Sequence, residues 1–423
     1  MKRAIVLSGG GGKGAYQIGV WKALRKMHIT YNIVTGTSVG ALNGAFMVQK
    51  DYIKALMMWK KMNFGEVYDT DVESDIHTVQ GKKEVATMYA KGIILEGGMN
   101  VDNLNKLIDK SFHEDKFRKS NLDFGLVTFN LSELKPIQLT KKEIPQGKVK
   151  DYLMASATCY PVFKKKEIAD KSYIDGGMYD NLPINLAIDM GAEEIIAVDL
   201  KAVGIKQKVK DKKVKIITIS PRNKINSFLV FDKEASHRAI RLGYNDTMKT
   251  FGMLDGNKFT FKKGHLEKNY KKYHTRFLGI AHSIFHFNRN KGLMDKIVTV
   301  SAFNKLFKET NDKDMNKLMN QTMEYLGKIF DMNEENNYDV RMYNRVLLDK
   351  MAKEDLEEVK NIDKLIKVGN VKQLINTKKI IEYIFIKIHH AEENSRYKKE
   401  LTSLALVFSK EFLAALYLYT ILD

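Results

Sequence analysis

A Gly-x-Ser-x-Gly motif at residues 36–40 has the residue types and spacing of a serine nucleophile on a tight turn. The apolar pair at 33–34 predicts the end of a buried strand, and apolar residues with helical spacing follow the motif. Such a turn leaves no room for a side chain at Gly36 or Gly40, and it lifts the Ser38 hydroxyl above the sheet beside a helix N-terminus. Because the motif also occurs by chance, it does not by itself exclude a serine in an ordinary glycine turn.

A glycine-rich loop, Ser8–Gly14, lies between a strand predicted at Ala4–Leu7 and a predicted helix. A dinucleotide-binding loop would need an acidic residue at the end of the second strand, where Thr35-Gly36 stands, so this interpretation is disfavoured. A nucleotide P-loop would need glycine at Leu7 and serine or threonine at Gly14, so it is excluded. The remaining chemical interpretation is an oxyanion hole, in which backbone N–H groups converge on one oxygen. The candidate residues are Gly9, Gly10, Gly11, Gly12, Lys13 and Gly14.

The histidines of the second half offer no clear base for Ser38. None of His237, His265, His274, His282 and His286 follows a clear strand end. His282 and His286 have i,i+4 spacing, but the segment between them lacks the glutamate of a zinc-protease helix. We therefore treat these histidines as surface or core residues, and we expect no metal site.

An aspartate is the better candidate for the base. Asp175 ends a predicted strand, and Gly176 and Gly177 after it allow a substrate and the serine turn to come close. Burial raises the pKa of a carboxyl group, which enables it to take the serine proton directly. Asp180, Asp189 and Asp199 compete for this role, and spacing alone only slightly favours Asp175.

Strands and helices alternate along the first 252 residues, which predicts a parallel sheet with helices on its faces. A strand pair is predicted at Phe124–Phe129 and Ile137–Leu139, and further buried strands at Ile195–Leu200 and Val214–Ile219. A helix is predicted at Phe231–Gly252, and mainly helical periodicity follows. We expect one domain at 1–252 and a helical domain at 253–423.

Composition indicates a globular protein with an uneven charge. The chain has 423 residues, 44% of them hydrophobic, one cysteine and a formal charge of +19. Residues 201–300 hold about 23 lysines and arginines against about 7 acidic residues. This excess favours an anionic membrane surface or nucleic acid as a partner, although a solvated lysine-rich face is the commoner cause.

The apolar segments predict no membrane span. Ala4–Leu7 is too short for a secretion signal, and no apolar run reaches about 18 residues. The most apolar stretch, 404–422, contains Lys410 and Glu411, which favours a buried or membrane-adsorbed helix. Together with the single cysteine, this predicts a cytoplasmic protein with peripheral membrane contact.

Three ordered motifs resemble those of the patatin-like phospholipase family. They are Ser-Gly-Gly-Gly-Gly-Lys-Gly at 8–14, Gly-Thr-Ser-Val-Gly at 36–40 and Asp-Gly-Gly at 175–177. Residues 155–161 and the Asn181 and Pro183 positions are softer similarities, and the likeness extends over about residues 1–250. Three motifs in this order are far more specific than any one of them.

The resemblance implies an α/β fold: a three-layer α/β/α domain with a mostly parallel sheet, followed here by a mainly helical C-terminal region. Ser38 would be the nucleophile and Asp175 the base. The N–H groups of Gly9, Gly10 and Gly11 would form the oxyanion hole, and Lys13 would fix that loop. The reaction would be hydrolysis of lipid acyl esters through an acyl-serine, with no metal or cofactor.

Two function classes follow from the resemblance and the charge pattern. The first is a phospholipase A or lysophospholipase acting at an anionic membrane, and the second is a catalytically silent binding protein with the same fold. We expect a lipid partner and no nucleic acid, because the basic region lacks a nucleic-acid motif. The sequence leaves homo-oligomer formation open.

Overall fold

The computed structural model describes residues 1–68, 78–95, 97–225, 227–285, 301–307, 312–351, 376–391 and 395–422. The chain divides into two compact units, Met1–Thr250 and Phe251–Asp423. His286 and the basic positions among residues 286–300 lie outside the described residues.

The N-terminal unit is built on one mostly parallel eight-stranded sheet. The strand order is β5-β6-β3-β2-β1-β7-β8, and β4 pairs with β3. The parallel strands are β1 (Arg3–Leu7), β2 (Ile33–Thr37), β3 (Asp123–Asn130), β7 (Glu194–Val198) and β8 (Lys215–Ile219). The antiparallel strands are β4 (Lys135–Thr140), β5 (Lys166–Ile168) and β6 (Lys171–Asp175). The sequence predicted most of these strands, but not β5.

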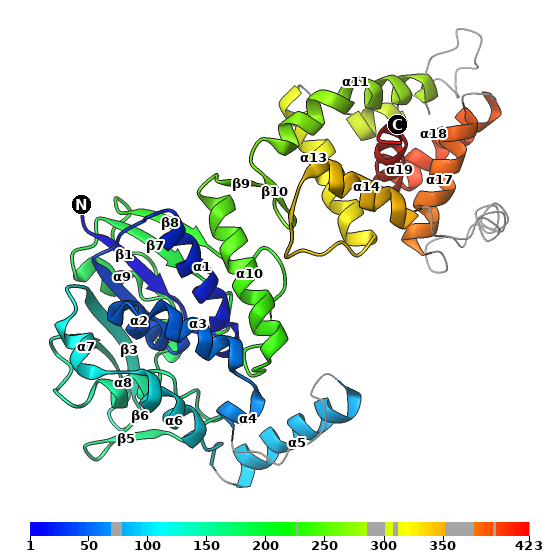
Figure 1. The fold of residues 1–423 in the computed structure, drawn as a ribbon. Coiled ribbons are helices and arrows are strands. Elements are labelled where there is room, and N and C mark those ends of the chain that lie inside the picture. The colour runs from blue at the N-terminus through cyan, green and yellow to red at the C-terminus, as the bar shows by residue number, and fades with distance from the viewer. Residues whose placement is uncertain are drawn as a thin grey trace. The chain divides into compact units, whose positions relative to one another are not determined.

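Helices cover both faces of this sheet, because successive side chains of its central strands point to opposite sides. Ala4 and Val6 pack with α9 (Ile184–Asp189) on one face. On the other face, α2 (Val39–Gln49) lies so close that its Gly44 approaches the side chains of Leu7 and Val34. Figure 1 shows α1 (Ala15–Lys26), α2 and α10 (Lys233–Thr250) gathered on this second side. The unit thus has the predicted three-layer α/β/α arrangement.

Helices α1 and α10 pack backbone to backbone through a glycine on each. A Cβ atom on Gly19 would lie 2.0 Å from the carbonyl oxygen of Ile240, and one on Gly243 would lie 2.1 Å from that of Tyr16. The Tyr16 hydroxyl also donates a 3.0 Å hydrogen bond to buried Asp246. These contacts attach α10, the last helix of the unit, to the helix that follows the glycine loop.

The remaining helices of the unit are α3 (Tyr52–Lys61), α4 (Phe64–Val67), α5 (Val79–Leu95), α6 (Asp102–Ser111), α7 (Glu114–Lys119) and α8 (Val149–Ser156). Two short 3-10 turns, η1 (Gly11–Gly14) and η2 (Gly176–Met178), belong to the glycine-rich segments that the sequence singled out.

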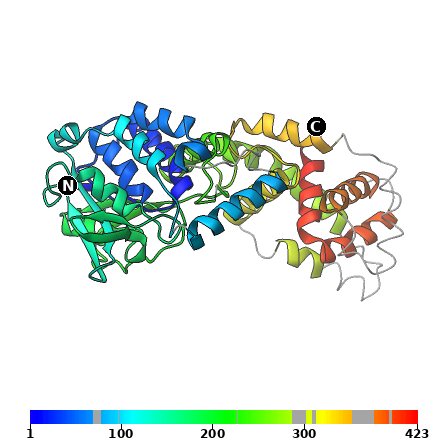
Figure 2. The same cartoon turned by 90° about the horizontal axis from the view of Figure 1, so that it is seen from below.

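The C-terminal unit is mainly helical, as predicted, and has its own core of methionine, aromatic and aliphatic side chains. Its helices include α11 (His265–Phe285), α13 (Asp312–Ile329), α14 (Val340–Met351), α17 (Thr377–Ala391), α18 (Ser395–Val407) and α19 (Ser409–Thr420). In Figure 2 the orange and red helices α17, α18 and α19 lie together. The sequence missed a small sheet of β9 (Leu254–Asp255), β10 (Thr260–Lys262) and β11 (Asn337–Tyr338), whose strands are too short to show a period.

The apolar C-terminal stretch forms α19, which lies within this core. Phe412 and Leu416 are fully buried, and Glu411 accepts a 2.8 Å hydrogen bond from the Tyr325 hydroxyl. The described helices include none with the length and apolar character needed to cross a bilayer.

Candidate active site

Ser38 lies on a sharp turn between β2 and α2. Its backbone has φ 57° and ψ −131°, a conformation that side-chain-bearing residues rarely adopt. A Cβ atom on Gly36 would lie 2.4 Å from the Gly40 carbonyl carbon, and one on Gly40 would lie 2.3 Å from the Leu7 carbonyl oxygen. The turn is therefore as tight as the motif predicted, and both glycines are needed for the chain to pass.

A serine that the sequence analysis gave no role braces this turn. The Ser38 N–H donates a 2.9 Å hydrogen bond to the hydroxyl of Ser156, which donates a 2.6 Å bond to the Val127 carbonyl. Ser156 is fully buried at the end of α8. The only signal for it was its place in the small-residue segment 155–161.

Asp175 is brought to Ser38 by strand pairing. Residue Thr128 of β3 pairs with Asp175 of β6, next to the position where Val127 pairs with Thr37 of β2. The Asp175 carboxylate accepts a 2.8 Å hydrogen bond from the Gly177 N–H, and it lines one cavity with Ser38. Burial raises the pKa of Asp175 from 3.8 to about 6, and the Gly177 N–H and the Ser38 hydroxyl oppose part of that rise.

The competing aspartates have other partners. Asp180 is buried and accepts from the backbone N–H groups of Leu182 and Gln207. Asp189 pairs with Lys210, and Asp199 pairs with Lys206 at 2.7 Å. Asp175 is the one of the four that lines a pocket together with Ser38.

The glycine loop passes directly beside Ser38. A Cβ atom on Gly9 would lie 3.0 Å from the Ser38 Cβ. The Gly9 N–H donates to the Asn181 carbonyl at 3.1 Å, and the Gly12 N–H donates to the Phe228 carbonyl at 2.7 Å. Within the described part of the chain, the N–H groups of Gly10 and Gly11 have no hydrogen-bond acceptor. Both of these glycines line the pocket that contains Ser38.

The direction of these two N–H groups is set by the carbonyl groups of the same peptide units. The Gly9 carbonyl accepts from the Ser8 hydroxyl at 3.1 Å, and the Gly10 carbonyl accepts from the Lys13 N–H at 3.1 Å. In a trans peptide the C=O and N–H groups point in opposite directions. The N–H groups of Gly10 and Gly11 therefore point away from the bonds that hold their partner carbonyls.

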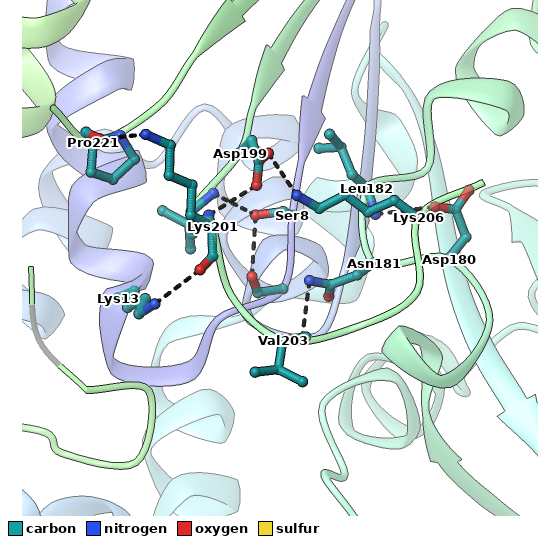
Figure 3. Close-up of polar contacts among 12 residues, drawn as sticks. Ser8, Lys13, Asp180, Asn181, Leu182, Asp199, Lys201, Val203, Lys206 and Pro221 are labelled. Atoms are coloured by element: carbon teal, nitrogen blue, oxygen red, sulfur yellow. Dashed lines mark hydrogen bonds and ion pairs between the residues drawn. The ribbon is translucent and has the colours of Figure 1, made fainter. Parts of the chain in front are cut away.

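The segment after β7 holds the outer side of the loop, as Figure 3 shows. The Leu200 N–H donates to the Ser8 hydroxyl at 2.9 Å, and the Lys13 ammonium donates to the Lys201 carbonyl at 3.3 Å. Partial burial lowers the pKa of Lys13, while the Asp199 charge opposes that shift. The Asn181 side chain donates to the Val203 carbonyl at 3.4 Å. The glycine loop is thus fixed to two other segments of the site.

Ser38, Asp175 and the glycine loop open on a cavity of about 290 Å³ with mostly apolar walls. Cys159 also lines it, and burial, with the nearby Asp175 charge, raises the pKa of its thiol to about 12. No histidine among the described residues lines this cavity. The apolar wall residues include Met58, Trp59, Met62, Ile108, Phe163 and Phe231, which come from helices or loops far apart in the sequence.

Comparison with known proteins agrees with this architecture. Residues 5–188 match the family model described as patatin-like phospholipase. The chain is 29% identical over 202 residues to "Lysophospholipase nte1" of Aspergillus terreus, and 25% identical over 201 residues to "Patatin-like phospholipase domain-containing protein 7" of Rattus norvegicus. Each match covers 47% of this chain, but only 12% and 13% of those longer relatives.

Among solved structures, VipD from Legionella pneumophila overlays with a TM-score of 0.40 at 13% identity, covering 100% of this chain and 91% of VipD. This score is too low to bear on function. The family match spans β1, the glycine loop, the Ser38 turn, Asp175 and the start of α9. Residues 5–188 of this chain are therefore similar to the patatin-like phospholipase family.

Proposed function

We propose that the N-terminal unit is a serine acyl hydrolase that cleaves lipid esters of the phospholipase A or lysophospholipase type. The observation that carries the proposal is the buried Asp175 carboxylate against the Ser38 hydroxyl, at one cavity with apolar walls. A carboxylate whose pKa is raised toward neutrality can both accept the serine proton and return it. The family match and the names of the relatives support a lipid ester as the substrate.

In the proposed reaction, the Ser38 oxygen attacks the ester carbonyl carbon and its proton moves to the Asp175 carboxylate. The negative oxygen of the tetrahedral intermediate accepts hydrogen bonds from the Gly10 and Gly11 N–H groups. The C–O bond then breaks, and the alcohol leaves with the proton from Asp175. Water attacks the acyl-Ser38 ester in the same way, which releases the fatty acid and restores the enzyme.

Gly10 and Gly11 are favoured over Gly9 as oxyanion donors because, among the described residues, their N–H groups have no hydrogen-bond acceptor. The Gly9 N–H is engaged by the Asn181 carbonyl, so its role is to let the loop approach Ser38. We propose that Lys13 holds the outer side of the loop through the Lys201 carbonyl.

Labelling with a fluorophosphonate probe tests the nucleophile and the base. We expect wild type to be labelled, Ser38→Ala to lose labelling, and Asp175→Asn to be labelled at least about a hundredfold more slowly. Ser156→Ala is a matched control, since it removes a neighbouring buried hydroxyl that braces the turn without touching the substrate. It should slow labelling far less than Asp175→Asn.

Equal labelling of wild type and Ser38→Ala would place the nucleophile elsewhere. An intact wild type that neither labels nor hydrolyses lysophospholipid, with or without vesicles, would instead favour the catalytically silent binding protein.

The proposed partner is an anionic lipid surface at the mouth of the cavity. Val203 lines the cavity and is nevertheless 95% exposed, and Met178 on the same rim is 54% exposed. The Val203 loop is fastened, because the Ile205 N–H donates to the Gly177 carbonyl at 2.9 Å. Exposed lysines 201, 206 and 208 flank this apolar tip. Apolar side chains among cations suit a headgroup layer of negative charge.

Vesicle sedimentation with the Ser38→Ala protein tests this contact without hydrolysis. We expect binding to phosphatidylglycerol vesicles that weakens as salt rises, and weaker binding still for Val203→Asp. Leu134→Asp is the control, since Leu134 is 74% exposed but does not line the cavity. Equal loss in both variants, or binding that ignores salt, would contradict the proposed surface.

A further inference from the structure

A buried chain of side-chain hydrogen bonds joins the wall of the cavity to the glycine loop. The indole N–H of Trp59 donates to the Asn43 Oδ1 at 2.9 Å. The Asn43 Nδ2 donates to the Gly14 carbonyl at 3.1 Å and to the Gln17 Oε1 at 2.8 Å. The Gln17 Nε2 donates to the Ser8 carbonyl at 2.8 Å.

The three side chains of this hydrogen-bond network are almost completely buried. Trp59 and Asn43 are each 1% exposed, and Gln17 is 2% exposed. They come from three helices, α3, α2 and α1 respectively. Trp59 and Asn43 also line the cavity that contains Ser38. Buried amides of this kind are costly unless each group is paired, so the network depends on its complete set of bonds.

The direction of every hydrogen bond in the network follows from the groups at which the network begins and ends. An indole N–H can only donate, so the Asn43 oxygen must face Trp59 and its NH₂ group must face Gly14 and Gln17. The Gln17 oxygen must then accept, which turns its NH₂ group toward the Ser8 carbonyl. Carbonyl groups can only accept, so the chain closes without a conflict. Reversing either amide would bring two acceptors together.

The series of hydrogen bonds ends on Ser8 and Gly14, the two residues that flank glycine-loop residues 9–13. The Ser8 carbonyl belongs to the same peptide unit as the Gly9 N–H. The two groups point in opposite directions, and the Gly9 N–H donates to the Asn181 carbonyl. The Gly14 carbonyl marks the end of η1 and the start of α1. Holding both carbonyls fixes the ends of a loop whose glycines have little conformational preference of their own.

We propose that Trp59, Asn43 and Gln17 are positioning residues, which hold the glycine loop so that Gly10 and Gly11 face the reacting carbonyl. This inference rests on the proposed acyl hydrolase activity. It assigns the polar edge of Trp59 a role separate from that of its ring, which forms part of the apolar wall. Loss of the indole N–H should therefore impair the chemical step for every ester, whatever the length of its acyl chain.

The experiment replaces Trp59 with its benzothienyl analogue, in which sulfur takes the place of the indole N–H and the ring keeps its shape. Trp59→Phe is the simpler genetic version. We expect kcat for p-nitrophenyl acetate to fall about tenfold, as for partial loss of oxyanion-hole geometry. We expect the same factor for the decanoate ester, with KM changed by less than about twofold.

The same replacement at Trp21 is the matched control, because Trp21 is a buried tryptophan on α1 that does not line the cavity. It should leave kcat and KM unchanged for both esters. A Trp59 benzothienyl variant that behaves like this control, or whose effect is confined to long acyl chains, would overturn the proposal.

Hydrogen exchange separates this inference from the proposed reaction. If Trp59 positions the loop, backbone amides of residues 8–14 should exchange at least about fivefold faster in the benzothienyl variant, while those of β7 stay unchanged. This measurement needs no turnover. Unchanged exchange in the loop would refute the positioning role even in an active enzyme. Faster exchange in a protein that hydrolyses nothing would support positioning and refute only the proposed reaction.

Discussion

Each unit of the molecule buries a network of amides and one aromatic side chain, and the two networks end differently. In the C-terminal unit, Asn269 donates to the Tyr417 hydroxyl at 2.9 Å, Tyr417 donates to Asn344 at 3.0 Å, and Asn344 donates to Asn269 at 2.9 Å. These three side chains form a closed ring, whereas the Trp59 chain of the N-terminal unit ends on backbone carbonyls of the glycine loop.

Two buried networks of similar chemistry can therefore have different roles. The role depends on which groups accept the last hydrogen bonds of the network. The closed ring joins α11, α14 and α19 to one another, and its three residues do not line the cavity that contains Ser38. Its hydrogen bonds therefore fix the packing of these helices. The open chain transmits the position of one helix to a loop that borders Ser38.

Glycine use differs between the units in the same way. Gly40 approaches the backbone of β1, while Gly279, in the middle of α11, has no atom within 4 Å of an added Cβ. We expect Gly40→Ala to lower the unfolding free energy of the N-terminal unit by at least about 4 kcal/mol, or to prevent its folding. Gly279→Ala should raise that of the C-terminal unit by about 1 kcal/mol, because alanine favours a helix. Urea unfolding followed in each unit would measure both.

Asp175 gives the N-terminal unit a pH dependence between pH 4 and pH 8, a range in which the closed ring stays uncharged because burial raises the pKa of Tyr417 above its ordinary value. The pKa of Asp175 is raised from 3.8 to about 6, so ionisation of this carboxyl disfavours the folded state. The cost is absent below pH 3.8, grows through pH 6 and is then complete, at about 3 kcal/mol. We expect Asp175→Asn to stabilise the unit by this amount at pH 8 and by little at pH 4. Equal stabilisation at both pH values would show that ionisation is not the cause.

Activity should show the opposite preference. As a base, Asp175 works only when it has lost its proton, so kcat/KM should fall about tenfold per pH unit below pH 6. A profile from pH 4 to pH 8 with a soluble ester would measure this slope. A flat profile over that range would exclude Asp175 as the base, and stability at each pH serves as the control.

The smallest expected effect concerns the closed ring. Tyr417→Phe removes one hydroxyl that both accepts and donates, so we expect a loss of about 2 kcal/mol in the C-terminal unit. Hydrolysis of a soluble ester should be unchanged, because the bonds of the ring do not extend to Ser38. Activity measured at a temperature where both proteins stay folded would test this, and a change in kcat would mean that the two networks are coupled.

The sequence predicted those parts of the site where the backbone itself restricts the residue type. A Cβ atom added to Gly36, Gly40 or Gly176 would lie within 2.4 Å of a backbone atom. Only glycine fits such positions, so they can be recognised in the sequence. The central strands β1, β2 and β7 were visible as short apolar runs for a similar reason, since both of their faces are buried.

Long-range side-chain contacts left no such trace. Ser156, Asn43 and Gln17 act through partners up to 118 residues away, and a serine or an amide in a helix has many ordinary explanations. The short strands of the C-terminal unit were missed because two or three residues cannot display a period of two. The roles of Ser38, Asp175 and the glycine loop remain predictions that the labelling experiments address.

The donor-only indole has a consequence for how this protein could change over time. The indole N–H of Trp59 sets the orientation of both amides in the hydrogen-bond network. A residue at position 59 that accepts instead of donating would place its acceptor against the Asn43 Oδ1, which is also an acceptor. A single exchange would then be penalised, and a joint replacement at Trp59, Asn43 and Gln17 by apolar residues would leave the buried Ser8 carbonyl without its side-chain donor. These three positions should therefore be retained as a set.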